Sequence, residues 1–393
     1  MPTPLAAALA DADLCVKCGL CLPHCPTYRL SAHEADGPRG RIALAQGLLT
    51  GAVTASPVLA AHLDGCLSCR ACEAVCPAKV PYGRVLDTAR ATLATPPRTR
   101  LTRAMAVVLD SPSLRALVRL ALWLWSRLRE HAGRRVLRGP RWLAYRPVVR
   151  RLRGVSAPAQ ASVALFTGCV SDIAEREVLQ DAVRLFAAAG VMVAIPPAQG
   201  CCGALQQHGG LPLPAATSAR RNALAFAACD TVLPLTTGCG AALRDLGTAA
   251  SDAPALAPKV RDLCATLATA LDAHPPVFKP LGLRVGIHTA CTQAHVFGAR
   301  TAIRQLLARI PGIDLVDLAP ESGCCGAAGT AFITHPGQAD QLLQPKLDAA
   351  RHVDVVVSAN IGCSLHWLAG LRREGRAVPV LHPVSLLAQA LGH

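Results

Sequence analysis

The sequence predicts an α/β protein in which a mostly helical, cysteine-rich N-terminal domain precedes two tandem repeats, each built on a parallel sheet. Three observations lead to this prediction. Two cysteine strings with the same spacing lie within residues 15–77. A different cysteine pattern follows residue 158 and recurs 122 residues later, with Cys169 repeated as Cys291. Short apolar runs alternate with helix-like stretches in both copies, which is the pattern of a parallel α/β unit.

The chain divides by composition into four segments. We expect a helical domain at 1–95, a basic linker at 96–157, a first repeat at 158–275 and a second repeat at 276–393. Between the two cysteine strings, residues 42–53 and 57–66 carry apolar side chains at helical spacing. The N-terminal domain is therefore predicted to be mostly helical.

Each cysteine string reads Cys-x2-Cys-x2-Cys-x3-Cys-Pro, first over residues 15–26 and again over 66–77. This is the ligand run of two-cluster bacterial ferredoxins, in which the fourth cysteine ligates the other [4Fe–4S] cluster. Zinc sites usually pair two thiolates with two more at a distance, and disulfide frameworks belong to short secreted chains. We therefore predict two clusters, one on Cys15, Cys18, Cys21 and Cys76 and the other on Cys66, Cys69, Cys72 and Cys25.

Two arginines between the strings have two interpretations. Arg39 and Arg41 would raise the reduction potential of a nearby cluster by offsetting its negative charge. Alternatively, they cap a turn or pair with Glu34 and Asp36.

Composition and cysteine usage limit the class of protein. Hydrophobic residues make up 52% of the chain and charged residues 17%, which excludes general disorder. Most of the 18 cysteines fall into metal-ligand spacings, which indicates a reducing compartment. The first predicted ligand is already residue 15, so we expect a cytoplasmic protein. No stretch approaches the roughly 20 apolar residues of a membrane span, so any membrane contact is expected to be peripheral.

Nearly all of the net charge of +15 lies in the linker, where residues 98–153 hold 15 arginines against two acidic residues. The centre of this segment, 113–129, has helical length, leucines, and tryptophans at 123 and 125. It fits an interfacial helix on anionic lipid, a partner-docking helix, or a helix packed on the next domain. No recognition motif or aromatic stacking platform accompanies the charge, so we expect no nucleic-acid binding.

The repeats share a lone cysteine, a Cys-Cys-Gly triplet and a final cysteine. These cysteines are Cys169, Cys201, Cys202 and Cys239 in the first copy and Cys291, Cys324, Cys325 and Cys363 in the second. Each element follows a short apolar run that we interpret as a buried strand. Ligands of such sheets gather beyond the carboxyl ends of the strands, so four thiols are predicted to converge in each repeat. Gly203 and Gly326 would let the backbone approach a bound group.

Converging thiols indicate metal, redox thiols or a catalytic cysteine. His366, one helical turn after Cys363, is the leading histidine candidate for a ligand or a cluster hydrogen-bond donor, ahead of His288, His295 and His335. His208 has no counterpart in the second copy and is interpreted as structural. Cys229 and Cys264 also lack counterparts, and we expect them to be small buried hydrophobes.

The repeats resemble the Cys-Cys-Gly domains of heterodisulfide reductase. In that family the pattern continues to Cys-x2-Cys and holds non-cubane [4Fe–4S] clusters. Here Ala242 and His366 occupy the position of the final cysteine, which leaves four thiols per repeat. The resemblance therefore implies one or two further iron–sulfur clusters, on four thiolates or on a Cys/His site in the second repeat.

Over nearly all of its length the chain resembles the iron–sulfur subunit of glycolate oxidase. The resemblance rests on CVKCGLCLPHCPTYRL, GPRGRI, CLSCRACEAVCPAKVPYG, GCCGA, TTGCGA, CCGAAGTAFITHP and SANIGC-x2-His. The anaerobic glycerol-3-phosphate dehydrogenase small subunit and the lactate-utilisation iron–sulfur protein share this cysteine plan.

This resemblance implies an electron-transfer subunit. A separate FAD-containing subunit is expected to oxidise glycolate or D-lactate, and this chain to relay single electrons to a quinone or another acceptor. The chain has no Gly-x-Gly-x-x-Gly fingerprint between a strand and a helix, so we expect neither FAD nor NAD in it. Two alternatives remain: an enzyme that reduces a disulfide at a repeat-bound cluster, as heterodisulfide reductase does, and a scaffold whose repeats bind zinc or no metal.

Overall fold

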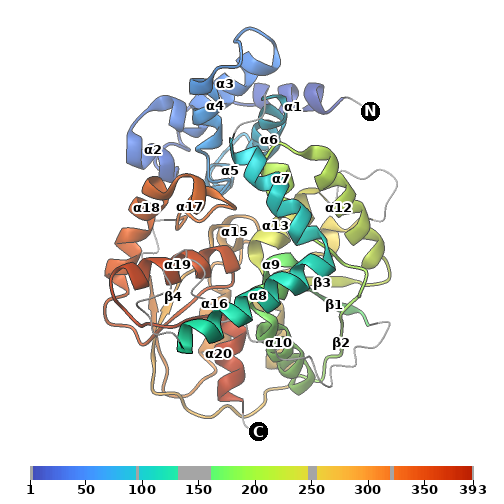
Figure 1. Cartoon of the computed structure of the whole chain (residues 1–393), viewed down its shortest axis with the longest axis vertical. Coiled ribbons are helices and arrows are strands. Elements are labelled where there is room, and N and C mark those ends of the chain that lie inside the picture. The colour runs from blue at the N-terminus through green and yellow to red at the C-terminus, as the bar shows by residue number, and fades with distance from the viewer. Residues whose placement is uncertain (1–2, 94–96, 132–160, 247–254, 319–322, 392–393) are drawn as a thin grey trace.

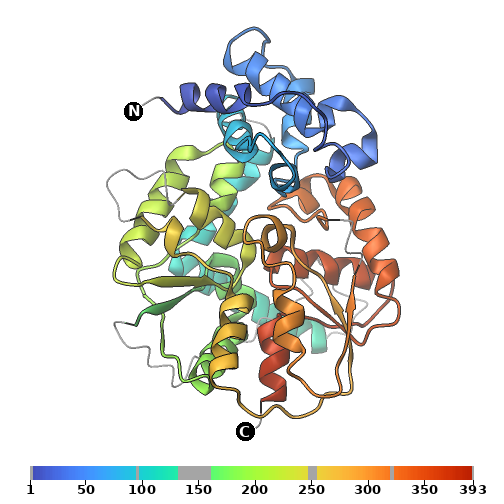
Figure 2. The ribbon, with the colours of Figure 1, turned by 180° about the vertical axis from the view of Figure 1, so that it is seen from behind.

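The computed structural model describes residues 3–93, 97–131, 161–246, 255–318 and 323–391. Within this part, a helical N-terminal domain lies across one end of two α/β repeats that stand side by side (Figures 1 and 2). The order of elements confirms the predicted fold class, with helices at the N-terminus and two parallel sheets after it.

The described part of the N-terminal domain contains helices and turns without strands. Its elements are α1 (Pro4–Asp13), α2 (Pro26–Ser31), η1 (Glu34–Asp36), α3 (Pro38–Leu49), α4 (Pro57–Asp64), α5 (Ala71–Ala74) and α6 (Tyr82–Thr92). Proline occupies the first turn of α1 to α4, where its missing N–H costs no helical hydrogen bond. Thr3 and Ser56 cap α1 and α4 through their hydroxyls. A core centred on Ile42, Leu63 and Leu86 joins α3, α4 and α6.

Two helices connect this domain to the repeats. Helix α7 (Pro97–Asp110) runs down from the N-terminal domain, and α8 (Pro112–His131) turns across the front of the molecule in Figure 1. Arg115 and Arg119 of α8 both bind the carboxylate of Asp172, at 3.2 and 2.8 Å. The side chains of Trp123 and Trp125, and the rest of the predicted linker from residue 132, lie outside the described residues.

The first repeat is a three-stranded parallel sheet with helices around it. Strands β1 (Val163–Phe166), β2 (Val193–Ala194) and β3 (Thr231–Pro234) have the order β2-β1-β3, with Val163 opposite both Val193 and Thr231. The helices are α9 (Cys169–Ala174), α10 (Arg176–Ala188), α11 (Ala204–His208), α12 (Pro212–Ala225) and α13 (Thr237–Leu246). The strands are short, buried runs of Val, Leu, Ala and Phe, as a sheet covered on both faces requires.

The second repeat has the same strand order with one strand added. Strands β4 (Arg284–Ile287), β5 (Asp314–Asp317), β6 (Val355–Val357) and β7 (Val380–Leu381) form the parallel order β5-β4-β6-β7. Between the two sheets the chain forms η3 (Ala257–Lys259) and α14 (Leu263–Ala273), within the span predicted for the first repeat, and Val260 after η3 pairs with Val232 of β3. The helices of the second repeat are α15 (Cys291–His295), α16 (Ala302–Leu307), α17 (Ala331–Thr334), α18 (Pro336–Ala349), α19 (Ile361–Arg373) and α20 (Pro383–Ala390). The matching order β2-β1-β3 and β5-β4-β6 supports the internal repeat inferred from the cysteines.

A shared core locks the two repeats together. Leu165 and Phe186 of the first repeat are buried in one cluster with Ile303, Val357 and Leu387 of the second. Backbone contacts also cross between them, including the bond from Thr237 N to Ala359 O at 3.0 Å. The relative position of the two sheets is therefore fixed by apolar packing.

His382 closes this interface as a buried neutral imidazole. Its Nδ1 accepts from Val384 N at 3.2 Å, and its Nε2 donates to Leu235 O of the other repeat at 3.0 Å. Burial lowers the pKa of His382 to about 4. An unfolded histidine titrates near 6.5, so the unfolded chain takes up the proton first and stability falls as pH drops below about 6.5.

We predict that His382→Gln, which keeps a donor for Leu235 O, removes this pH dependence. The wild-type chain should lose about 1.4 kcal/mol more unfolding free energy than the variant between pH 7.5 and 5.5. Anaerobic urea denaturation at the two pH values measures this difference. An equal loss in both proteins would show that His382 does not titrate in this range on unfolding.

Candidate metal centres

Two neighbouring cavities in the N-terminal domain are lined by the two cysteine strings. Each cavity brings together three cysteines of one string and the last cysteine of the other: Cys15, Cys18, Cys21 and Cys76 at the first, and Cys66, Cys69, Cys72 and Cys25 at the second. Cys72 borders both cavities. Four converging thiols are the donor set of a [4Fe–4S] cubane, so these residues fit the group that the spacing predicts.

Left-handed backbone turns aim the thiols of each string at one point. Lys17 and Gly19 have φ of 56° and 84°, and the matching residues of the second string, Ser68 and Arg70, have φ of 48° and 61°. Residues other than glycine seldom adopt this conformation, and its recurrence at matched positions marks a local structure that the ligands require. The same turn geometry thus serves both cavities.

Buried cations flank the second cavity. The guanidinium of Arg41 is 1% exposed and donates to His62 O at 2.7 Å and to Thr27 Oγ1 at 2.8 Å, and that hydroxyl lies 3.2 Å from Cys25 Sγ. Arg90 donates to Cys66 O at 2.8 Å. Burial raises the pKa of a thiol, but these two guanidiniums outweigh it and lower the pKa of Cys66. Burial raises the pKa of the neighbouring thiols, Cys69 and Cys72.

The structure shows the carboxylate pairing of both arginines and also places them near the cysteines, while their effect on a reduction potential stays a prediction. Arg39 pairs with Glu34 through two hydrogen bonds of 2.7 and 3.0 Å, and it also lines the first cavity. Arg41 lies 3.6 Å from the carboxylate of Asp36, and it also faces the thiol of Cys66 at the second cavity. A Cβ on Gly40 would lie 2.1 Å from Glu34 O, so the glycine between the arginines allows this tight arrangement.

In the first repeat, four thiols meet at the carboxyl ends of the strands. Cys169 begins α9 after β1, Cys201 and Cys202 follow β2, and Cys239 lies in α13 after β3. We call these four residues the first thiol set. Cys169 Sγ lies 3.5 Å from Cys201 Sγ, and hydrogen bonds from Cys169 and Cys202 lower the pKa of Cys201. Met105 and Leu109 of α7 pack over Cys169 and Cys201.

The second repeat has the same arrangement, with Cys291 at the start of α15, Cys324 and Cys325 after β5, and Cys363 in α19. We call these four residues the second thiol set. Its thiols receive hydrogen bonds from protein groups, with Gly326 N 3.3 Å from Cys324 Sγ and Asn360 Nδ2 3.1 Å from Cys363 Sγ. Hydrogen bonding to its neighbours and burial raise the pKa of Cys291.

The two glycines after the cysteine pairs have a packing role. Gly203 and Gly326 have φ of 87° and 86°. A Cβ at Gly326 would lie 2.8 Å from the backbone of Ala339 in α18, and one at Gly203 would lie 3.2 Å from Ala215 O in α12. At both glycines the backbone comes close to a helix. The sequence predicted instead that these glycines let the backbone come close to a bound group.

The histidine nearest the second thiol set is His288, and not His366, which the sequence favoured. A ring nitrogen of His288 and the sulfurs of Cys325 and Cys363 lie within 4.8 Å of one another. His366, the leading candidate from sequence, places its Nε2 3.2 Å from Ala339 O, and its ring packs against Phe332. The signal for His288 was its place directly after a strand, three residues before Cys291.

Sequence reasoning also missed Lys346 of α18. Its side chain is 1% exposed; burial lowers its pKa, and all four cysteines of the second thiol set are near enough to act on it in the opposite direction. A buried lysine is rare unless a negative partner is near, so its environment is predicted to carry negative charge. The available signal was a lysine at a helix position where the first repeat has Asn222.

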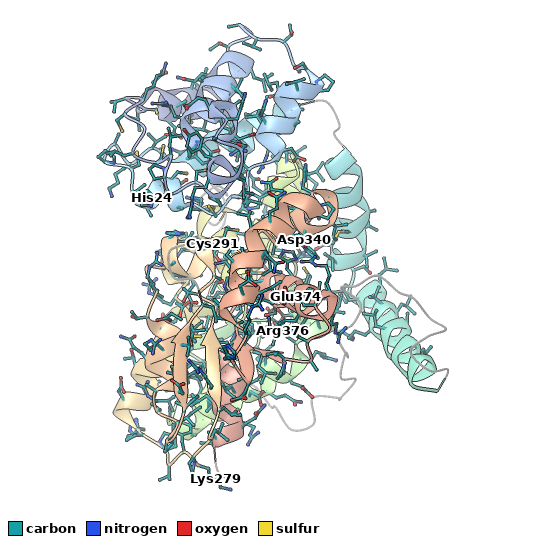
Figure 3. All side chains as sticks on the ribbon, turned by 90° about the vertical axis from the view of Figure 1, so that its left-hand side faces the viewer. His24, Lys279, Cys291, Asp340, Glu374 and Arg376 are labelled. Carbon is teal, nitrogen blue, oxygen red and sulfur yellow. The ribbon has the colours of Figure 1, made fainter. Side chains whose placement is uncertain are left out.

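The N-terminal domain places its second cavity against the second repeat. Cys69 packs in one buried group with Cys324 and Cys291. In Figure 3, His24 on the N-terminal domain and Cys291 on the second repeat lie near this boundary. Arg70 fixes the contact on the side of the first repeat through its ion pair with Asp245, at 2.6 Å.

His295 lines the same cavity as Cys291, whereas the other remaining candidates make structural contacts. Cys229 and Cys264 are buried in apolar clusters, as predicted. His208 lies 3.1 Å from Asp87 and joins the first repeat to α6. His335 contacts Thr334 Oγ1 at 2.9 Å.

Comparison with known proteins gives the class of this protein. A 4Fe-4S dicluster domain matches residues 11–80, and a cysteine-rich domain matches twice, at 163–244 and 285–367. The chain is thus an iron–sulfur protein with a dicluster domain followed by two cysteine-rich domains, which confirms the prediction of multiple clusters.

The chain is similar over almost its whole length to two glycolate oxidase iron–sulfur subunits. It is 31% identical to the probable subunit of Bacillus subtilis over 96% of this chain and 94% of that protein. It is also 31% identical to the Escherichia coli subunit over 96% of this chain and 93% of that protein. Lactate utilization protein A of Oceanobacillus iheyensis is 30% identical over 57% of this chain and 96% of that protein. The chain belongs to the family of glycolate oxidase iron–sulfur subunits.

We predict that removing the buried charge of Arg41 lowers the reduction potential of a cluster in the second cavity. A unit charge about 8 Å away contributes about 2 kcal/mol at an effective dielectric of about 20, so Arg41→Met should lower the potential by on the order of 90 mV. Arg41→Lys keeps the charge and should lower it less. EPR-monitored redox titration measures the shift. Equal potentials in wild type and Arg41→Met would contradict the assigned role of the guanidinium.

Proposed function

We propose that this chain is the electron-transfer subunit of a flavin-dependent 2-hydroxy-acid dehydrogenase. The observation that carries the proposal is the pair of adjacent four-thiol cavities in a member of the glycolate oxidase iron–sulfur family. A partner subunit with FAD oxidises the substrate, glycolate or D-lactate. The electrons then pass through this chain to a quinone or another acceptor. The sequence has no dinucleotide fingerprint, and we assign no catalytic residue to this chain.

The crossed cavities define the proposed ligands. Cys15, Cys18, Cys21 and Cys76 hold one [4Fe–4S] cluster, and Cys66, Cys69, Cys72 and Cys25 hold the other. When bound, each cubane supplies one-electron chemistry, which lets a two-electron flavin be oxidised in single steps. Arg41 and Arg90 offset the charge at the second cavity, and Tyr82 donates to Cys66 Sγ at 3.5 Å.

The two thiol sets of the repeats are the proposed sites of further clusters. Their eight cysteines, Cys169, Cys201, Cys202, Cys239, Cys291, Cys324, Cys325 and Cys363, fit thiolate-held iron. The second thiol set adjoins the second cavity through Cys69, which supports a position next along the electron path.

We predict that Cys69→Ala interrupts this relay. Reduction of quinone by the assembled complex with glycolate should fall at least about 100-fold, because the second cluster loses a ligand. The flavin of the partner should still be reduced by glycolate, as seen by its absorbance. Cys229→Ala, at a buried cysteine that belongs to neither thiol set, is the matched control. Quinone reduction that survives Cys69→Ala would refute the relay.

Disulfide reduction at the repeats is a second candidate. The observation in its favour is a pocket that reaches Cys291 and is lined by Arg300 and Lys346. Robust reduction of a disulfide by this chain, with a reduced viologen as donor, would replace the first proposal with this one.

We propose that the protein is cytoplasmic and that α8 contacts the membrane surface peripherally. In the described residues no helix has the length and apolar character to span a membrane. The arginines at 115 and 119 turn toward Asp172, while Leu117, Leu120 and Leu124 are 60%, 48% and 47% exposed. Figure 3 shows α8 projecting from the body of the molecule. This outward leucine face, within a strongly basic segment, fits an anionic lipid surface.

We predict that Leu117→Asp/Leu120→Asp abolishes binding to vesicles containing anionic lipid. Co-sedimentation should fall at least about tenfold, since two exposed apolar side chains that would enter the lipid become charged. Leu213→Asp, an exposed leucine on α12, is the control and should bind as the wild type does. If the wild type does not bind vesicles, but its leucine variant loses the flavin subunit, α8 is a partner-docking helix instead.

A further inference from the structure

The two repeats differ at two buried positions beside their thiol sets. Aligning Cys169 with Cys291 places Phe166 opposite His288, each three residues before its cysteine. Aligning α12 with α18 places Asn222 opposite Lys346, each the eleventh residue of its helix. An apolar ring and a neutral amide in the first repeat are thus replaced by an imidazole and an ammonium in the second.

In the first repeat, both positions serve the fold. Phe166 is fully buried and packs against Phe226 with a ring separation of 6.0 Å. Asn222 accepts from Gly200 N at 2.9 Å and donates to Cys201 O at 2.8 Å, which fixes the loop of the cysteine pair. Phe166 has no atom that could bind a metal, and both polar atoms of Asn222 are engaged with the loop.

In the second repeat, His288 is buried beside the thiols with a ring nitrogen that has no hydrogen-bond partner among the described residues. Its side chain is 1% exposed, and its Nε2 is buried with no hydrogen-bond partner among the residues that the structure describes. A buried polar atom without a partner is costly, so such an atom in a native structure calls for an unseen partner. The ring lies with the sulfurs of Cys325 and Cys363 inside 4.8 Å, close to the spacing of ligands that share one metal ion at bonds of about 2.0–2.3 Å.

Lys346 supplies the charge that such a centre needs. It lines one cavity with Cys291, and all four cysteines of the second thiol set are near enough to act on its charge. Thiolates bound to iron carry net negative charge, and a buried ammonium beside them offsets it. The position of Cys69 against Cys291 and Cys324 puts this centre beside the second cavity of the N-terminal domain, which favours a redox-active metal over structural zinc.

We propose that the second repeat holds an iron–sulfur centre in which His288 is a ligand alongside the four cysteines of the second thiol set. The imidazole takes the place of the fifth thiolate that this chain lacks. A neutral ligand leaves the centre less negative than thiolate alone would, which raises its reduction potential. This proposal depends on the proposed function in one respect: it assumes that the cavities of the N-terminal domain, which adjoin the second repeat, hold clusters.

The test uses the full chain, purified anaerobically and labelled with 15N-histidine. Pulsed EPR of the wild type should show 15N coupling from a directly bound imidazole, with iron and acid-labile sulfide above the roughly eight of each that two cubanes require. His288→Phe, which installs the residue of the first repeat, should lose the coupling and the part of the excess iron that the second repeat holds. His366→Phe is the matched control and should keep both.

Three outcomes would overturn the proposal. These are a wild type without 15N coupling, a coupling that His366→Phe removes instead of His288→Phe, and stoichiometric zinc in the second repeat. The first of these outcomes is measured on the wild type, so it does not depend on whether a variant folds. All of these readouts are independent of electron delivery from the flavin, so failure of the proposed function is recognised separately by the quinone assay.

A second variant tests the charge. Lys346→Met should retain the 15N coupling but lower the potential of the centre by more than about 59 mV, a tenfold change in its one-electron equilibrium. An unchanged potential would remove Lys346 from the proposal, and loss of the coupling would show that the lysine positions His288.

Discussion

The rest of this structure depends on one constraint: thiols must converge at four places, the two cavities of the N-terminal domain and the two thiol sets of the repeats. Burial raises the pKa of Cys69 and Cys72 and contributes to raising that of Cys324 and Cys325, so without metal these groups hold their protons. Metal binding needs thiolates and therefore releases protons. The fold keeps the thiols close at the carboxyl ends of strands and in left-handed turns, and metal binding offsets the cost of deprotonation.

Buried cations reduce this cost unevenly. Arg41 and Arg90 face the second cavity, where they lower the pKa of Cys66, and Lys346 faces the second thiol set. The first thiol set is covered by apolar side chains of α7, and the guanidinium of Arg115 in α8 acts on Cys169. The two repeats share one strand order, but only the second has a buried lysine beside its thiols among the described residues.

Much of this arrangement follows from sequence because it is encoded by spacing over short distances. The interval between cysteines brings three thiols of a string together, and the alternation of apolar runs and helices defines the parallel sheets. Each guanidinium has a carboxylate partner, as one interpretation expected, and in addition Arg39 lines the first cavity and Arg41 acts on the thiol of Cys66 at the second. Their effect on a reduction potential stays a prediction.

Other features depend on contacts between distant residues and could not be read from spacing. His366 lies one turn after Cys363, but its Nε2 meets Ala339 O on another helix. The ion pair of Arg70 with Asp245 joins residues 175 positions apart. The arginines of α8 turn inward to Asp172, so the direction of its leucines depends on the docking of the first repeat.

The crossed ligation of two clusters in the N-terminal domain is the central claim, and a comparison of EPR spectra tests it most directly. Four single variants of the full chain would be reduced with dithionite and their EPR spectra compared with that of the wild type: Cys18→Ser, Cys76→Ser, Cys69→Ser and Cys25→Ser. Crossed ligation predicts that Cys76→Ser changes the same cluster signal as Cys18→Ser, and that Cys25→Ser changes the same signal as Cys69→Ser. If Cys76→Ser instead alters the signal that Cys69→Ser alters, each string holds its own cluster and the ligands are not crossed.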